Sequence, residues 1–114
     1  MNKPFILDKP IESSFCTPGA TGFCFDLTNK KIEIDFIDSV IGHGGKVSSD
    51  TLTHIYYILD GEGDFEIDEA TYHARAGQLV EIPPHHTFDY KGKMKMLLIV
   101  EPPFTPDQIK HLDK

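Results

Sequence analysis

Apolar and polar residues alternate with a period of two along most of the chain after about residue 22. Such alternation is typical of half-buried β-strands, because successive side chains of a strand point to opposite faces. The predicted strands cover residues 23–27, 32–36, 54–59, 65–67, 71–74, 79–82, 88–90 and 94–100. Short strands at even spacing, with Gly and Pro at the joints, indicate an all-β sandwich or barrel of mostly antiparallel strands.

Turn-forming residues set the expected boundaries. Residues 60–63 (Asp-Gly-Glu-Gly) and 91–93 (Lys-Gly-Lys) are predicted to be turns between neighbouring strands. Residues 1–22 contain several Pro, Gly, Ser and Thr and are expected to form an irregular N-terminal arm lying on the barrel. Residues 105–114 are expected to form a short tail, helical at most, with Thr105 as N-cap and Pro106 at the first position. We therefore expect a single domain over residues 1–114, with the barrel at 23–104.

Composition excludes several classes of protein. The chain has 114 residues with 39% hydrophobic and 25% charged residues, which suits one globular domain. Its net charge of -7 argues against a nucleic-acid partner. The longest apolar run near the N-terminus is only Phe5-Ile6-Leu7, so neither a membrane partner nor a signal peptide is expected, and a cytoplasmic location follows as the default.

The two cysteines, Cys16 and Cys24, are too few for a disulfide framework. We expect both to be free thiols packed as small hydrophobic residues. The absence of a Cys-x-x-Cys pair argues against a zinc site.

One face of the strand at 54–59 carries the most informative side chains. Alternation places His54 and Tyr56 inside the barrel, and Phe88 and Tyr90 should share the inward face of their own strand. His54 has two interpretations: a core histidine hydrogen-bonded to Tyr56 or Asp50, or a ligand-binding or acid–base group in a pocket. The aromatic residues are likewise consistent with core packing or with the lining of a small-molecule pocket.

The last strong strand is apolar on both faces. Met94, Met96, Leu98 and Val100 lie on one face, and Leu97 and Ile99 lie on the other. A strand buried on both sides implies a second layer outside it, so we expect a homodimer.

The spacing of glycines, histidines and prolines from about residue 32 to 104 resembles the two motifs of the cupin family. The first motif is matched by Gly42, then Ser48-Ser49-Asp50, His54 and Gly61. The second begins at Gly77 and reaches Pro83 after five residues. The phrases YYILDGEGDFEID and AGQLVEIPP are also similar to those of cupins. This resemblance implies an antiparallel jelly-roll barrel, the double-stranded β-helix.

The resemblance also locates the positions that hold metal in other cupins, which here are Ser48, Asp50, His54 and Phe88. Serine is a poor ligand for a divalent metal and phenylalanine is none, so no cofactor is favoured at these positions. The alternative is a divalent metal (Zn, Fe, Mn or Ni) held by His54, Asp50 and a further histidine. That histidine could be His86, His85 or His43.

Three functions remain open from the sequence. The first is a cupin that binds a small molecule, sugar-like or an organic acid, without the usual metal centre, whether or not it turns the ligand over. The second is a metal-dependent isomerase, decarboxylase or dioxygenase with irregular ligands. The third is a structural or regulatory dimer with a degenerate pocket. The candidate pocket residues are His54, Tyr56, Asp50, Ser48, Phe88, Tyr90 and His86.

Overall fold

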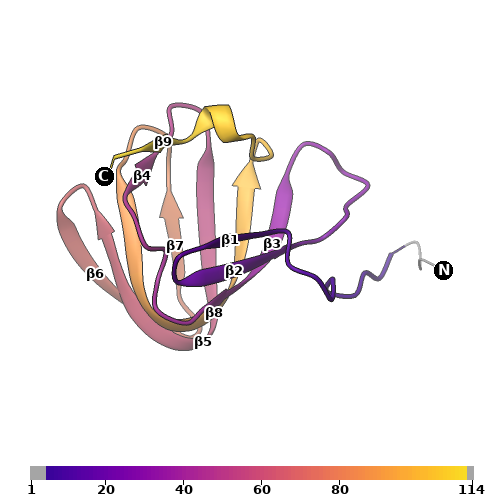
Figure 1. The fold of residues 1–114 in the computed structure, drawn as a ribbon, viewed down its shortest axis with the longest axis horizontal. Helices are drawn as coiled ribbons and strands as arrows, with labels where there is room; N and C mark the ends of the chain where they lie inside the picture. The colour runs from indigo at the N-terminus through magenta and orange to yellow at the C-terminus, as the bar shows by residue number, and fades with distance from the viewer. Residues whose placement is uncertain (1–4, 113–114) are drawn as a thin grey trace.

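The computed structural model describes residues 5–112, which are almost entirely β-structure (Figure 1). The elements are β1 (Phe15–Thr17), β2 (Ala20–Cys24), β3 (Glu33–Ser39), β4 (Val47–Ser48), β5 (Thr53–Ile67), β6 (Ala70–Arg75), β7 (Leu79–Ile82), β8 (Phe88–Glu101), the 3-10 turn η1 (Pro106–Gln108) and β9 (Lys110–His111). All strand pairs are antiparallel, and the sheet curls on itself into a barrel, as the sequence predicts.

Two long strands form the backbone of the barrel. β5 and β8 pair from Thr53↔Glu101 to Ile67↔Phe88, and both bend sharply midway (Figure 1). On one half of this ladder β7 extends the sheet beside β5, while β3 extends it beside β8. On the other half β6 pairs with β5 and β4 with β8. The two halves of each long strand therefore lie on different walls of the barrel.

The two turns predicted within these strands do not exist. Residues 60–63 and 91–93 instead belong to the continuous strands β5 and β8, with a shift of register between Ile58 and Asp60. Glycine makes the bend possible: a Cβ on Gly61 would lie 2.2 Å from the carbonyl oxygen of Lys93, and Gly61 has a φ of +86°. Close backbone approach with positive φ is a role that only glycine fills without strain.

The ends of the chain are more ordered than the sequence suggests. The expected irregular arm contains the hairpin β1–β2, which joins the sheet through β3. The tail forms only η1, with Thr105 at its N-cap, and then adds β9 beside β4. Residues 1–4 and 113–114 of the predicted arm and tail lie outside the described residues. Both cysteines are free, as predicted, although Cys16 is exposed rather than packed.

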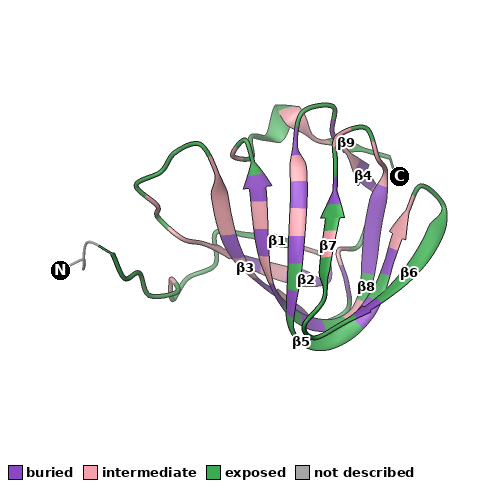
Figure 2. Cartoon of the chain, turned by 180° about the vertical axis from the view of Figure 1, so that it is seen from behind, coloured by how far each residue is buried: buried purple, intermediate pink, exposed green. Residues whose placement is uncertain are grey.

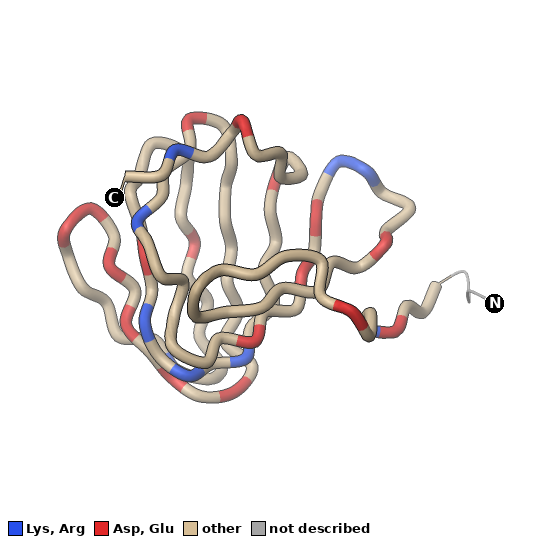
Figure 3. The backbone as a smooth tube through the Cα atoms, viewed as in Figure 1, with Lys and Arg blue, Asp and Glu red and all other residues tan. Residues whose placement is uncertain are grey.

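Burial follows the inner face of the curled sheet (Figure 2). Its largest fully buried apolar residues are Phe65, Ile37, Leu52, Ile58, Ile82, Met94, Met96 and Val100. Charged residues gather in the loops and along the bend (Figure 3), where Lys91, Lys93 and Lys95 are exposed on β8. No helix within residues 5–112 is long and apolar enough to cross a membrane.

Candidate functional site

A cavity of about 250 Å³ occupies the barrel interior. Its central wall consists of inward-facing residues of β5 and β8, among them His54, Tyr56, Phe88 and Tyr90. The hairpin β1–β2 and the segment from Phe104 to His111 also contribute lining residues. Both chain ends therefore help to enclose the cavity, which the prediction of a passive arm and tail did not include.

The register of the sheet explains which side chains meet. His54 lies opposite Val100, and Tyr56 lies opposite Leu98, on the same face of the β5–β8 ladder. His54 is 7% exposed and Tyr56 is 2% exposed, whereas Tyr57 on the other face is 40% exposed. The alternation read from the sequence along β5 therefore gives the correct inward face.

Aromatic rings form one continuous cluster in the cavity wall. The His54 ring lies 5.0 Å from that of Phe88, and the Tyr56 ring lies 5.3 Å from that of Tyr90. Phe65, at 0% exposure, closes the base of the cluster with centroids 5.4 Å from Tyr56 and 5.3 Å from Tyr90. These tilted and edge-to-face contacts fix the orientation of each ring.

The polar atoms of this cluster are free for a ligand. Within residues 5–112, no hydrogen bond engages the ring nitrogens of His54 or the hydroxyls of Tyr56 and Tyr90. Among residues 5–112 only the Asp35 carboxylate oxygens are buried without a partner, so the polar atoms of these three residues are open to the cavity. The hydrogen bond from His54 to Tyr56 or Asp50, required by the interpretation of His54 as a core residue, is not formed in the described structure.

Burial also keeps these groups uncharged near neutral pH. Desolvation, with a smaller contribution from the nearby His43, lowers the pKa of His54 to about 4. Desolvation raises the pKa of both Tyr56 and Tyr90 well above its usual value. A neutral imidazole can donate one hydrogen bond and accept another, and a neutral phenol can do the same.

His43 is a site residue that the sequence analysis weighted too weakly. It follows Gly42, which has a φ of +150° and on which a Cβ would lie 2.4 Å from the Tyr90 carbonyl oxygen. The His43 ring lies 5.4 Å from the Tyr90 ring and lines the cavity. Its Nδ1 lies 2.8 Å from the Gly45 carbonyl oxygen, and a ring nitrogen bonded in this way donates its proton. The other ring nitrogen is then an acceptor.

Three predicted site residues do not line the cavity: Ser48, Asp50 and His86. Ser48 lies beside the inward-facing Val47 on β4, so alternation turns its side chain away. The Ser49 hydroxyl accepts hydrogen bonds from the backbone N–H groups of Thr51 and Leu52, at 3.1 and 2.9 Å. This turn breaks the phase between β4 and β5, and it leaves Asp50 exposed.

Asp50 and the histidine doublet form surface pairs instead. Asp50 accepts from the Lys110 ammonium at 2.8 Å and lies 3.2 Å from Nδ1 of His85. Lys110 first, and His85 second, lower the pKa of Asp50. His86 pairs with Asp68 and lowers the pKa of that carboxyl. The interpretation of Asp50 as a partner of His54 is therefore not supported.

The positions that correspond to the metal ligands of cupins do not fit a metal here. Only His54 among them presents a donor to the cavity, because Phe88 is apolar and Ser48 and Asp50 lie outside the lining. The irregular set of His54, Asp50 and His86 does not converge either, since Asp50 and His86 are engaged elsewhere. A metal site needs three or four converging donors.

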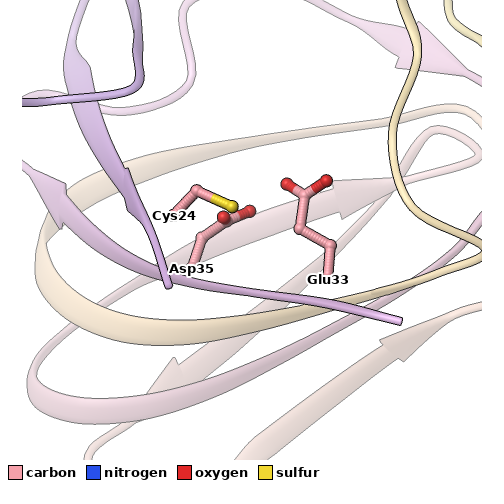
Figure 4. A group of neighbouring side chains, drawn as sticks. All are labelled: Cys24, Glu33 and Asp35. Carbon is pink, nitrogen blue, oxygen red and sulfur yellow. The ribbon is translucent and has the colours of Figure 1, made fainter. Parts of the chain in front are cut away.

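A second polar group lies in the wall formed by β2 and β3. Cys24 pairs with Asp35 across the two strands, and Glu33 lies two residues before Asp35 on the same face. Donor atoms of the three side chains lie within 4.8 Å of one another (Figure 4). Desolvation, followed by the neighbouring Glu33, raises the pKa of Asp35. Desolvation, followed by Asp35, raises the pKa of the Cys24 thiol to about 12.

Comparison with known proteins supports the fold inferred from the sequence motifs. The model of the AraC-like ligand-binding domain matches residues 48–92. The solved structure of Pac13, described as a unique nucleoside dehydratase, has a TM-score of 0.81 at 22% identity, covering 93% of this chain and 84% of its own. A variant of Streptomyces PAC13 with uridine has a TM-score of 0.87 at 23% identity, with coverages of 98% and 92%. No curated protein sequence matches the chain.

A more distant structure has the same fold. KdgF from Halomonas sp. has a TM-score of 0.70 at 14% identity, covering 84% of this chain and 89% of its own. The barrel and the motif spacing therefore agree with these structures in fold, an antiparallel jelly-roll of the cupin type.

Proposed function

We propose that this protein binds a small, uncharged, hydroxyl-bearing molecule in the barrel cavity. One observation carries the proposal: the polar atoms of His54, Tyr56 and Tyr90 face an enclosed cavity without partners among residues 5–112. Because these polar atoms are open to the cavity, a bound ligand can form hydrogen bonds with all three groups.

The chemistry of the walls supports a neutral ligand with a flat ring. Aromatic and aliphatic side chains dominate the lining, and neither Lys nor Arg occurs among the described lining residues. The acidic groups of the lining, Glu33 and Asp35, disfavour an organic acid on electrostatic grounds. Of the two ligand types considered from the sequence, the sugar-like one is therefore favoured.

Structural similarity supports a nucleoside as the specific form of this ligand. Three PAC13 structures contain uridine, and the variants they describe change one His to Gln in one case and one Tyr to Phe in each of the others. Histidine and tyrosine are among the residue types that present free polar atoms to the cavity in this chain. A base stacked among Tyr56, Phe88 and Tyr90 would leave the ribose hydroxyls to the histidines.

A second candidate function is metal-independent elimination of water from such a ligand. Neutral His54 can take up a proton, and a phenol can donate one to a leaving hydroxyl, so the cavity holds both halves of an acid–base pair. The similarity to Pac13, itself a nucleoside dehydratase, favours this reaction over the metal-dependent chemistries considered above.

The outer face of the sheet supports a homodimer. Ile34, Ile99 and Ile55 lie side by side across β3, β8 and β5, and Phe36, Leu97 and Tyr57 form the next row. Tyr57 is 40% exposed and the neighbouring Leu79 is 57% exposed. We propose that a second copy covers this apolar face.

The free cysteines are consistent with a reducing compartment, and we propose that the protein is cytoplasmic.

Calorimetric titration with uridine tests the proposed ligand. Wild-type protein should bind uridine saturably, and uridine 5′-monophosphate should bind more weakly because its phosphate has no cationic partner in the lining. His54→Ala should weaken uridine binding by about 1–3 kcal/mol with little change in melting temperature. Absence of saturable binding of uridine would contradict the proposal. A His54→Ala variant that melts far below wild type yet binds normally would make His54 a core residue.

A further inference from the structure

The wall formed by β2 and β3 contains a donor set that the proposed function does not use. Cys24 Sγ and the carboxylates of Glu33 and Asp35 converge at one point of the cavity wall (Figure 4). None of them belongs to the positions that hold metal in other cupins. Glu33 and Asp35 line the cavity, so this point is open to small solutes.

The buried carboxyl of Asp35 lacks a partner within this cluster. Its residue is 0% exposed, and neither carboxylate oxygen has a hydrogen-bond partner in the described structure. Cys24 and Glu33 lie nearby, but a thiol is a weak donor and an ionised carboxylate offers none. A buried carboxyl without a partner is among the most costly groups in a protein interior, so the missing partner requires identification.

The surroundings of the cluster contain acceptors but no counter-charge. Within residues 5–112, no salt bridge engages Glu33 or Asp35. The Phe104 backbone N–H donates a hydrogen bond to Glu33 Oε1 at 3.0 Å. This bond holds one carboxylate oxygen in place and leaves Oε2 available to a cation. The Cys24 thiol makes only a 3.6 Å contact with the Phe25 carbonyl oxygen. Two carboxylates and a thiol without a nearby cation form an environment suited to a cation.

We propose that Cys24, Glu33 and Asp35 form a binding site for a divalent metal ion of the zinc type. Zinc takes thiolate sulfur and carboxylate oxygen in tetrahedral sites, and three protein donors leave one position open. Tetrahedral bonds of the usual length place donor atoms about 3.5 Å apart. Small rotations of the Cys24 and Glu33 side chains, which are only half-buried, would close the present separation of up to 4.8 Å.

The open coordination position would face the cavity. Tyr56 lies in the same row of the sheet as Asp35, with Leu98 between them, and Asp35 contributes to the raised pKa of Tyr56. The ion would therefore lie on the same sheet as Tyr56, with one strand between them. Binding would release the Cys24 thiol proton, and the Asp35 proton where present, to solvent.

Cobalt titration of the reduced, metal-free full chain tests this site in the absence of any organic ligand. Co²⁺ should bind one per chain and give a thiolate-to-cobalt absorption band in the near ultraviolet, which Zn²⁺ should abolish by displacement. Cys24→Ser should remove the band, and Asp35→Asn should weaken binding on the order of tenfold or more. Zn²⁺ should raise the melting temperature of wild type but not of Cys24→Ser.

Two matched variants serve as controls. Cys16→Ser removes the other thiol, which also lines the cavity, and should keep the band. His54→Ala removes the remaining donor at a usual cupin position and should also keep it. A wild-type protein without the band, a band that persists in Cys24→Ser, or one lost in Cys16→Ser would overturn the proposal. Uridine binding in the presence of a chelator is a separate measurement, so the two proposals can fail independently.

Discussion

The rings of Tyr56 and Tyr90 meet edge to face in the cavity wall, with centroids 5.3 Å apart and planes at 66°. The two residues come from different long strands, β5 and β8, and neither hydroxyl has a partner within residues 5–112. Packing thus holds both rings in place without help from their hydroxyls. The hydroxyls are therefore available for recognition, and removing them should leave the fold intact.

Tyr56→Phe and Tyr90→Phe should each lower the affinity for uridine by about 1 kcal/mol while leaving the melting temperature unchanged or slightly higher. The stability result follows because each variant removes a hydroxyl that faces the cavity and makes no hydrogen bond within residues 5–112. Tyr72→Phe is the matched control, since Tyr72 is 55% exposed and lies outside the cavity. Calorimetry of the three variants checks the predicted change in affinity, and thermal melts check the predicted melting temperatures. A loss of stability on the order of 1 kcal/mol or more would show that the hydroxyl is bonded inside the protein.

The pKa of His54 predicts an acid-dependent loss of stability. Its pKa is about 4 in the folded chain against 6.5 for the free side chain. Below pH 6.5 His54 therefore binds a proton in the unfolded state, whereas in the folded state it binds one only near pH 4 and below. The contribution of neutral His54 is complete above pH 6.5 and is lost as the pH falls toward 4, on the order of 3 kcal/mol in total.

Urea denaturation of wild type and His54→Gln at several pH values isolates the contribution of His54. The contributions of the other titrating groups cancel when the two unfolding free energies are subtracted. His43 and Tyr56 are the titratable neighbours of His54, and both remain in the variant. Titration by NMR provides an internal contrast. The pKa of His73 is raised, first by Asp64 and then by Glu62, so His73 should gain its proton well before His54. Titration of His54 near its usual pKa would contradict the buried geometry.

Glycine substitutions should show that the bends of β5 and β8 depend on close backbone approach. Gly61 and Gly77 both have positive φ, +86° and +91°. A Cβ at Gly61 would meet the Lys93 carbonyl oxygen at 2.2 Å, whereas one at Gly77 would meet nothing within 4 Å. Gly77→Ala should cost about 1–2 kcal/mol of unfolding free energy, the penalty for a left-handed conformation alone. Gly61→Ala should cost clearly more, and equal losses in urea denaturation would refute the steric argument.

Charge placed on the outer face should separate the proposed dimer. Leu97 lies between Phe36 and Tyr57 in the sheet, at the centre of the apolar rows. Leu97→Glu should convert a dimer to a monomer at micromolar concentration in sedimentation velocity, because a buried unpaired charge is costly. Val40→Glu is the control, since Val40 is 61% exposed in the loop after β3. A wild-type protein that sediments as a monomer would exclude the dimer directly.

The sequence predicts the fold well because its strongest signals are local. Alternation at His54, Tyr56 and Ile58 sets the inward face of β5, and the glycine and proline spacing indicates the barrel. The same rule fails in β3, where the apolar Ile34 and Phe36 are expected to face the core. The structure buries Asp35 and Ile37 on the inner face instead. The outer face of β3, with Ile34 and Phe36, is more apolar than the inner face, which includes Asp35 and Ser39, so hydrophobicity alone indicates the wrong side.

The site was harder to predict because it depends on contacts between distant segments. The turn stabilised by the Ser49 hydroxyl interrupts the alternation of inward and outward side chains and places Asp50 at the surface. The alternation of apolar and polar residues in the sequence does not reveal a single turn of this kind. His43 reaches the cavity only because Gly42 approaches Tyr90 closely. The group of Cys24, Glu33 and Asp35 forms only once β2 and β3 are paired in register.

The cavity is enclosed by two segments that carry little of the barrel's strand pairing, the hairpin β1–β2 and the stretch from Phe104 to His111. The long ladder of β5 and β8 holds the aromatic wall independently of both segments. Substitutions in the hairpin or the tail can therefore reshape the mouth of the cavity with little loss of barrel stability. Descendants of one such barrel can exchange one ligand for another by changing these two segments while the inherited wall remains constant.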